Sequence, residues 1–190
     1  MDPYAFLFKH LLRRLDAEAA HHLATTALRA GNVGWIRRAM RGRLAPRDPV
    51  LRTQALGLSL PSPLGVPAGL DKELTAFEGL GALGFGFVEV GTITAVPQAG
   101  NPKPRVWRLL EDRGLLNAMG FPNAGAAKAA ERLARRSHDG VVAINVGKSK
   151  RASLEEAAAD YRTTVRQLAP LADFIVLNVS SKCLSHAFCS

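Results

Sequence analysis

Three asparagines, one serine and one lysine have side chains that could together bind a small polar ring. Asn117, Asn145, Asn178 and Ser181 all stand where an expected strand or apolar run ends, and Lys72 follows another short apolar run. A primary amide offers both donors and an acceptor, so several amides pointing at one place can recognise the N–H and C=O groups of a planar ring. Lys72 would add a positive charge for a carboxylate. The alternative is that each asparagine only caps a helix or a turn.

Two phosphate-binding patterns are absent. The run GKS at 147–149 resembles the end of a P-loop, but position 142, where that pattern needs glycine, is a valine. The glycines at 81, 84 and 86 do not have the G-x-G-x-x-G spacing of a dinucleotide-binding turn. The sequence therefore does not predict an NTPase or a Rossmann dehydrogenase.

The elements that must position these side chains follow a repeating order. Apolar, strand-like runs are expected at 64–68, 85–90, 141–146 and 174–179, and helices at 75–83, 124–136 and 153–168. Ser153 and Glu156 form a capping box at the start of the last helix. Such an order predicts an α/β fold with parallel strands and helical crossovers, whose functional residues gather at the carboxyl ends of the strands. An alternating stretch at 51–60 and a long connection at 98–123 complete this part.

The N-terminal region is expected to be a basic, amphipathic helical hairpin. Apolar residues recur at helical spacing from Tyr4 to Leu15, Asp16 can cap a second helix, and Gly31 can end it. The apolar face of the second helix would consist of Ala20, Leu23, Ala24, Ala27 and Leu28. Residues 32–50 are expected to be an irregular basic connector. The hairpin suits a membrane surface, and the alternative is that it packs on the protein's own core.

Composition and charge limit the function classes. The chain has 190 residues, a formal charge of +9 and 47% apolar residues, which excludes a disordered chain. Residues 1–55 carry ten Lys and Arg against four Asp and Glu. That charge would also suit nucleic acid, but no aromatic series or recognition motif accompanies it, so we expect no nucleic-acid partner.

Metal, redox and membrane-spanning roles have little support in the sequence. His21-His22 has no carboxylate or cysteine at ligand spacing, so we expect no metal site. Cys183 and Cys189 are the only cysteines, which excludes a disulfide scaffold and favours a reducing compartment. No apolar run reaches the roughly 18–20 residues needed to span a bilayer. The first residues do not show a basic region followed by an apolar run and a cleavage site, so we expect that the protein is not secreted.

Four runs in register resemble the class 2, quinone-linked dihydroorotate dehydrogenases. They are AGLDKELTAFEGLGALGFGFVEVGTIT, GNPKPRVWRL with NAMGFPN, INVGKSK, and NVSS, and the N-terminal hairpin also resembles that class. The resemblance covers about residues 4–181. It implies a TIM (β/α)8 barrel that binds FMN, oxidises dihydroorotate to orotate in pyrimidine synthesis, and passes electrons to a ubiquinone-type quinone.

The resemblance also implies a role for each matched position. The FMN contacts would be Ala68, Gly69, Leu70, Asp71, Lys72, Thr92, Asn145 and Asn178. The substrate contacts would be Lys72, Asn117, Ala118, Met119, Gly120, Phe121 and Asn178. Ser181 would be the base that takes a proton from substrate C5, and His21 and Arg108 would lie near the quinone channel. The hairpin would hold the protein at the cytoplasmic face of a bacterial inner membrane.

The chain also departs from the family. Ala118 stands where an arginine is common and Pro122 where an asparagine is common. After Ser181 the chain lacks the Pro-Asn-Thr stretch and the second half of the barrel. We therefore expect a membrane-associating segment at 1–45, the first half of the barrel with about four strands at 46–181, and a divergent tail at 182–190. Such a fragment would hold little FMN, with catalysis in doubt, and a non-catalytic or self-associating half-barrel is the alternative.

Overall fold

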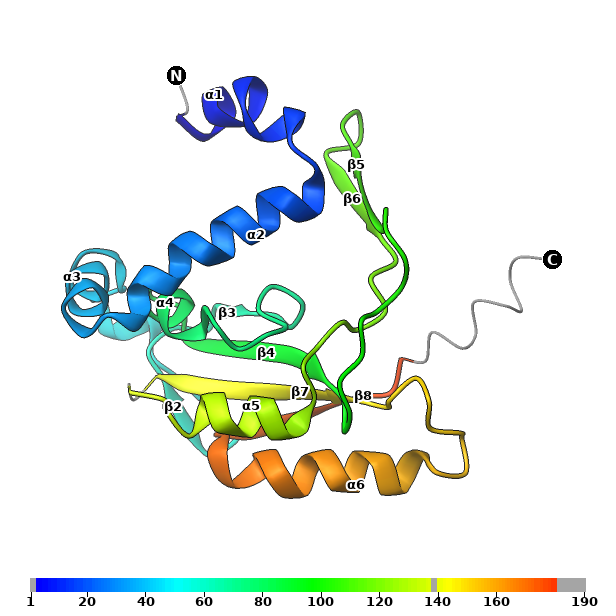
Figure 1. The fold of residues 1–190 in the computed structure, drawn as a ribbon. Coiled ribbons are helices and arrows are strands. Elements are labelled where there is room, and N and C mark those ends of the chain that lie inside the picture. Colours follow the sequence, from blue (N-terminus) through cyan, green and yellow to red (C-terminus); the bar gives the residue numbers. More distant parts are fainter. Residues whose placement is uncertain (1–2, 138–139, 181–190) are drawn as a thin grey trace.

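A four-stranded parallel sheet forms the centre of the protein (Figure 1). The computed structural model describes residues 3–137 and 140–180. The strands lie in the order β3 (Gly65–Val66), β4 (Phe87–Ile93), β7 (Val141–Gly147) and β8 (Phe174–Asn178). The crossovers contain α4 (Phe77–Ala82), α5 (Ala126–Leu133), and α6 (Ala157–Leu168) with the short 3-10 helix η4 (Ala169–Leu171). The predicted order of strands and helices is confirmed, and it is that of a partial barrel.

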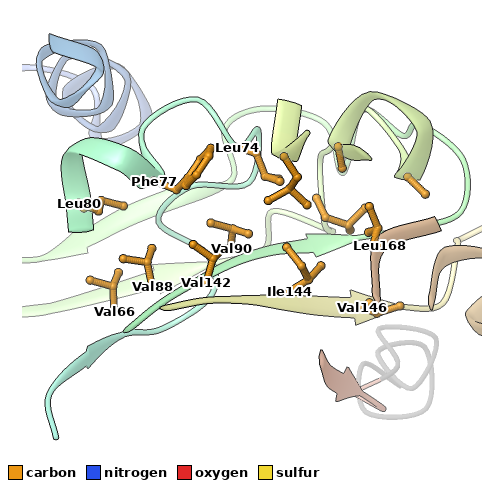
Figure 2. Close-up of a cluster of buried hydrophobic side chains, with 14 residues drawn as sticks. Val66, Leu74, Phe77, Leu80, Val88, Val90, Val142, Ile144, Val146 and Leu168 are labelled. Carbon is orange, nitrogen blue, oxygen red and sulfur yellow. The ribbon is translucent and has the colours of Figure 1, made fainter. Parts of the chain in front are cut away.

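The hydrophobic core lies between one face of this sheet and its helices. Val88 of β4 pairs with Val142 of β7, and Val90 pairs with Ile144, and all four side chains are fully buried. Figure 2 shows them beneath Phe77 and Leu80 of α4. Successive residues of a strand point to opposite faces, so packing of these residues fixes which residues of β4 and β7 face away from the helices.

The capping box before α6 forms as predicted, although the α-helix itself begins later. The Ser153 N–H donates to Glu156 Oε2 at 2.9 Å, and the Glu156 N–H donates to Ser153 Oγ at 3.2 Å. Residues 154–156 form a turn, and α6 begins at Ala157. The predicted boundary at 153 was therefore one turn too early.

Two antiparallel hairpins flank the parallel sheet. β1 (Thr53–Ala55) and β2 (Leu58–Leu60) are joined by Leu56 and Gly57, whose φ values are +54° and +74°. Two positive φ values in a two-residue turn match the twist of the strands. The long connection at 98–123 contains β5 (Val106–Leu109) and β6 (Gly114–Asn117), which sequence analysis did not predict. This second hairpin projects from the sheet (Figure 1).

The N-terminal region forms two α-helices, each followed by a 3-10 turn. They are α1 (Pro3–His10), η1 (Leu12–Arg14), α2 (Ala17–Leu28) and η2 (Arg29–Asn32). Asp16 caps α2 as predicted, because its Oδ1 accepts the Ala19 N–H at 2.9 Å. The expected apolar face of α2 is largely solvent-exposed, with Leu23 56% exposed, whereas Glu18 and Thr25 are buried.

The prediction of an irregular connector at 32–50 was wrong. α3 (Gly34–Leu44) occupies most of it, and a 3-10 turn η3 (Pro49–Leu51) follows. Arginines are good helix formers. Arg41 and Arg43 lie in the last turn, where cations interact favourably with the helix dipole. Arg37 of α3 binds Glu78 of α4 at 2.5 Å. That ion pair attaches α3 to α4. No local sequence pattern predicts it, because the two residues are 41 positions apart.

Two glycines let η2 approach α4 closely. Gly31 does not end α2 as predicted, but lies within η2 and is buried. A Cβ at Gly31 would lie 2.3 Å from Gly79 Cα, and a Cβ at Gly79 would lie 2.0 Å from the Leu28 carbonyl oxygen. A side chain at either position would therefore force η2 away from α4.

We predict that Gly79→Ala destabilises the protein by about 1–3 kcal/mol or more, because its methyl group overlaps backbone that has no room to move. Gly42→Ala is the matched control, since a Cβ at Gly42 in α3 meets nothing within 4 Å. It should stabilise by about 0.5–1 kcal/mol through higher helix propensity. Urea unfolding of both variants measures the difference, and equal effects would contradict the close approach.

Candidate functional site

Polar side chains from three strands meet at the carboxyl edge of the sheet. Gly91 of β4 pairs with Asn145 of β7, and Gly147 pairs with Asn178 of β8. The Thr92 hydroxyl donates to Asn145 Oδ1 at 2.7 Å. The Asn178 amide donates to Asn145 Oδ1 at 3.2 Å and to Thr92 Oγ1 at 3.3 Å. Parallel pairing thus brings Thr92, Asn145 and Asn178 into one network, as the sequence predicted for the two asparagines.

This network lies on the face of the sheet opposite the hydrophobic core. Asn145 alternates with the core residues Ile144 and Val146, and its amide donates to Glu89 Oε1 at 2.7 Å. Sequence analysis missed Glu89. The available signal was a carboxylate within the apolar run FVEV, which requires a partner when it is partly buried.

The Asn178 amide is oriented by its neighbours. Its Oδ1 accepts the Ser180 N–H at 3.0 Å and the Ser180 hydroxyl at 2.6 Å, and its backbone carbonyl accepts the Tyr161 hydroxyl at 2.6 Å. Ser181, the predicted base, follows Ser180 and lies outside the described residues. So does the predicted tail at 182–190, which contains both cysteines. The amide of Asn178 is therefore already pre-organised at the end of β8.

The turn after β3 leaves open space beside its backbone. Gly69 has φ +108°, which favours glycine, and a Cβ built there would meet nothing within 4 Å. Its N–H donates to the Gly91 carbonyl at 2.9 Å, so the turn is attached to β4. Ala68 is half-buried and Leu70 is 37% exposed on either side of it. A flat ligand could therefore approach the backbone here.

Asp71 is used within the protein. Its carboxylate is 2% exposed and accepts the Thr75 N–H at 3.0 Å and the Ala76 N–H at 2.8 Å. Its carbonyl accepts the Gly91 N–H at 3.1 Å. These bonds hold the turn at 68–72 between β4 and α4, so Asp71 shapes the site through its neighbours.

Lys72 and His21 lie close enough to affect each other. The Lys72 Nζ donates to the Gly69 carbonyl. Burial lowers the pKa of His21 below its ordinary value of 6.5, and the positive charge of Lys72 lowers it further. A predicted quinone-channel residue on α2 therefore lies near a predicted carboxylate-binding residue at the strand ends.

The connecting loop (residues 98–123) brings the second group of predicted residues over the sheet. A Cβ at Gly147 would lie 2.5 Å from Thr92 Cγ2 and 3.8 Å from Phe121 Cε2, which places the Phe121 ring beside the ends of β4 and β7. The Gln98 side-chain amide donates to the carbonyls of Gly120 and Phe121 at 3.0 and 3.2 Å. Sequence analysis did not assign a role to Gln98, because its partners are more than twenty residues away.

Asn123 anchors the far end of the connecting loop. It is 4% exposed, its Oδ1 accepts the Gly125 N–H at 2.8 Å, and its amide donates to Thr94 Oγ1 and to the Phe121 carbonyl at 2.9 Å each. Ala118, Met119 and Gly120 are half-buried in the same loop. The end of the loop is thus fixed to Thr94, which directly follows β4.

Asn117 and Arg108 lie on the projecting hairpin. Asn117 ends β6 opposite Val106 and is exposed, and among the described residues it forms no hydrogen bond with Thr92, Asn145 or Asn178. Arg108 of β5 donates to the Leu15 carbonyl at 2.6 Å, next to the start of α2. The two predicted quinone-channel residues, His21 and Arg108, therefore flank the region where α2 packs against β5.

The arrangement offers amide donors and acceptors, an ammonium group and a glycine backbone on one side of the sheet. Such a set can hold a flat heterocycle and an anionic substrate, and it contains no strong base among the strand-end amides and hydroxyls. In the described part of the chain, no three His, Cys, Asp or Glu side chains gather as metal ligands.

Comparisons with known proteins point to one family. A family model described as dihydroorotate dehydrogenase matches residues 50–183. The dihydroorotate dehydrogenase (quinone) of Clavibacter sepedonicus is 51% identical over 184 residues, which are 94% of this chain and 52% of that protein. The protein of the same name from Thermobifida fusca is 48% identical over 183 residues, 94% of this chain and 48% of that one. The chain spans about half the length of these curated relatives.

Solved structures of the same family superimpose on this chain. Ligand-free DHODH from Eimeria tenella superimposes with a TM-score of 0.75 at 36% identity, covering 87% of this chain and 46% of that one. Its complex with ferulenol gives a TM-score of 0.69 at the same identity, covering 87% of this chain and 44% of that one. The fold and the sequence thus match the same group of proteins.

We predict that Thr92→Val lowers the free energy of unfolding by about 1–2 kcal/mol, because Asn145 and Asn178 lose the buried hydroxyl between them. Thr92→Ser keeps the hydroxyl and should retain most of that stability. Urea unfolding monitored by tryptophan fluorescence measures both variants. If serine and valine cost the same, the hydroxyl has no part in the network.

We predict that Lys72→Met raises the pKa of His21 towards 6.5, because one of the charges that disfavour the imidazolium is removed. NMR titration of the His21 ring protons measures this, with Lys128→Met on α5 as the control that should leave it unchanged. Since the folded state lowers this pKa, His21 binds its proton less tightly than in the unfolded chain. Its cost to stability therefore appears as the pH falls below about 6.5, and Lys72→Met should reduce that cost.

Proposed function

The chain belongs to the dihydroorotate dehydrogenase family, and from that membership we propose that it carries the flavin- and substrate-binding residues of a quinone-linked dihydroorotate dehydrogenase. The observation that carries the proposal is the network of Thr92, Asn145 and Asn178 at the strand ends, with the open backbone of Gly69 beside it. In parallel α/β folds, ligands bind at this edge.

Family membership implies a flavin, and we assign it as FMN. The residues fit such a group: Gly69 leaves room for a flat ring, and Asn145 and Asn178 offer amides to its polar edge. Ala68, Leu70 and Thr92 would complete the contacts, and Asp71 would act by holding the turn. A flavin held there would supply the hydride acceptor for C6 of the substrate.

The substrate would lie between the strand ends and the connecting loop. The Lys72 ammonium would bind the carboxylate of dihydroorotate, since a charge-assisted hydrogen bond is among the strongest available. Asn178 would serve both ligands, and residues 117–121 would cover the substrate and exclude water. Phe121 beside Gly147 supports this arrangement, because it brings the loop to the ends of β4 and β7.

We assign Ser181 as the base that removes the proton from substrate C5. A serine hydroxyl is a poor base at its ordinary pKa, so the surrounding site must exclude water and relay the proton onward. Just before it in the sequence, Ser180 is hydrogen-bonded to the side chain of Asn178.

The N-terminal segment 1–45 would contact the membrane and the quinone, and residues 46–181 would hold the flavin. Phe6, Leu7, Leu11 and Leu23 of the helical region are between 45% and 56% exposed, which suits insertion into a lipid surface. His21 and Arg108 would lie along the path from that surface to the flavin. None of the helices in the described ranges is long and apolar enough to cross a bilayer. We propose a peripheral protein on the cytoplasmic face of a bacterial inner membrane.

The test joins residues 1–181 of this chain to the remainder of the Clavibacter sepedonicus relative, because this chain spans about half of that protein. We expect the joined protein to bind FMN and to reduce a quinone analogue only when dihydroorotate is present. Lys72→Met should raise the KM for dihydroorotate about tenfold or more through the lost charged hydrogen bond. Lys128→Met is the matched control. Quinone reduction that does not depend on dihydroorotate would overturn the proposal.

A further inference from the structure

A buried ion pair joins α2 to the connecting loop. Glu18, in the first turn of α2, is 5% exposed, and Arg105, just before β5, is 8% exposed. Arg105 Nη2 donates to Glu18 Oε1 at 2.7 Å, and Nε donates to Oε2 at 3.2 Å. The fork of the guanidinium matches both carboxylate oxygens, a geometry that fixes orientation as well as distance.

The rest of Arg105 organises the connecting loop. Its Nη1 donates to the carbonyls of Ala99 and Asn101 at 2.8 and 3.0 Å. Its own carbonyl accepts the Ala118 N–H at 2.9 Å. The side chain of Arg105 thus holds the start of the connecting loop. Its backbone carbonyl holds Ala118, a residue predicted to contact the substrate.

Asn101 carries this order one step further. Its backbone N–H donates to the Met119 carbonyl at 2.9 Å, and its side-chain amide donates to the Ala118 carbonyl at 2.8 Å. The approach is tight, because a Cβ at Gly100 would lie 2.3 Å from the Met119 oxygen and 2.8 Å from Arg105 Nη1. A displaced guanidinium would therefore displace Ala118 and Met119.

We propose that Arg105 is a positioning residue for residues 117–121, and that Glu18 holds its guanidinium in place, so that docking of α2 sets the shape of the connecting loop. The inference rests on the proposed function for the identity of the ligand, which is dihydroorotate. The contacts from Glu18 to Met119 are independent of that identity.

Arg105 is the buried basic partner of Glu18, whereas Lys103 and His22, which also reach Glu18 Oε1, are exposed. Lys103 Nζ lies 3.4 Å from Glu18 Oε1, but its side chain is 64% exposed, and such a pair is screened by solvent. Hydrogen bonding from Arg105 lowers the pKa of Glu18 to about 2, so the carboxylate stays ionised at any physiological pH. Removing that charge leaves the buried guanidinium without its partner.

The first measurement is amide hydrogen exchange on the full chain. We expect Glu18→Gln to speed exchange at the Asn101 and Ala118 amides about tenfold or more, as loss of a charged hydrogen bond would. Ile144 in β7 should stay within about twofold. Lys103→Gln, which removes an exposed partner of Glu18 and leaves the buried one, is the matched control. Arg105→Lys should behave like Glu18→Gln, because lysine keeps the charge but lacks the fork.

The second measurement is steady-state kinetics on the joined protein. If Arg105 positions the loop, Glu18→Gln and Arg105→Lys should raise the KM for dihydroorotate severalfold, with kcat and the KM for quinone little changed. Lys103→Gln should leave all three values unchanged. A purely structural role would lower the amount of folded enzyme without moving this KM.

The outcomes separate the two proposals. Faster exchange confined to the α2 amides, with Asn101 and Ala118 unchanged, would overturn the positioning role whatever the enzyme does. Wild-type exchange rates and an unchanged KM in Arg105→Lys would also overturn it, because a positive charge alone would then be enough to hold the loop. Loss of dihydroorotate dependence in the unsubstituted joined protein would overturn the proposed function, while the exchange result would still decide the role of Arg105.

Discussion

Parallel pairing of β4, β7 and β8 determines where the network of Thr92, Asn145 and Asn178 lies. Because Gly91 is opposite Asn145 and Gly147 is opposite Asn178, side chains from three strands meet at one edge. A slip of one residue would turn Asn145 towards the helices and Ile144 towards the site. The fully buried Val90 and Ile144 oppose such a slip, because their side chains would leave the core. The hydrophobic face thus fixes the geometry of the polar one.

The sheet and part of the site could be predicted because their signals are local. Near-continuous apolar runs bounded by glycine indicate buried parallel strands, and a polar residue at the end of each run must lie at the common edge. Asn145 and Asn178 met there for that reason. Asp16 was recognised as a helix cap because its partner is three residues away. The family resemblance added roles that the residues alone leave open, such as that of Ser181.

The remaining features depend on partners that are distant in the sequence. Arg105 is an ordinary basic residue until Glu18 faces it, and Arg37 needs Glu78 before α3 has a place to pack. The β5–β6 hairpin was missed because its short strands are stabilised by each other and by α2, and not by a core-facing pattern. The role of Asp71 is a different case, because its partners are local: backbone amides four and five residues later donate to its carboxylate, and its contact with FMN stays a prediction.

The close approach of Gly31 and Gly79 has a consequence for how the chain is made. The N-terminal helices can dock only after α4 has been synthesised and has left the ribosome. At about 5–20 residues per second, the intervening chain takes roughly 2–10 s to appear. Throughout that interval both faces of α2 are uncovered. A chaperone at the exit tunnel or a nearby bilayer can therefore reach this helix before the rest of its own chain does.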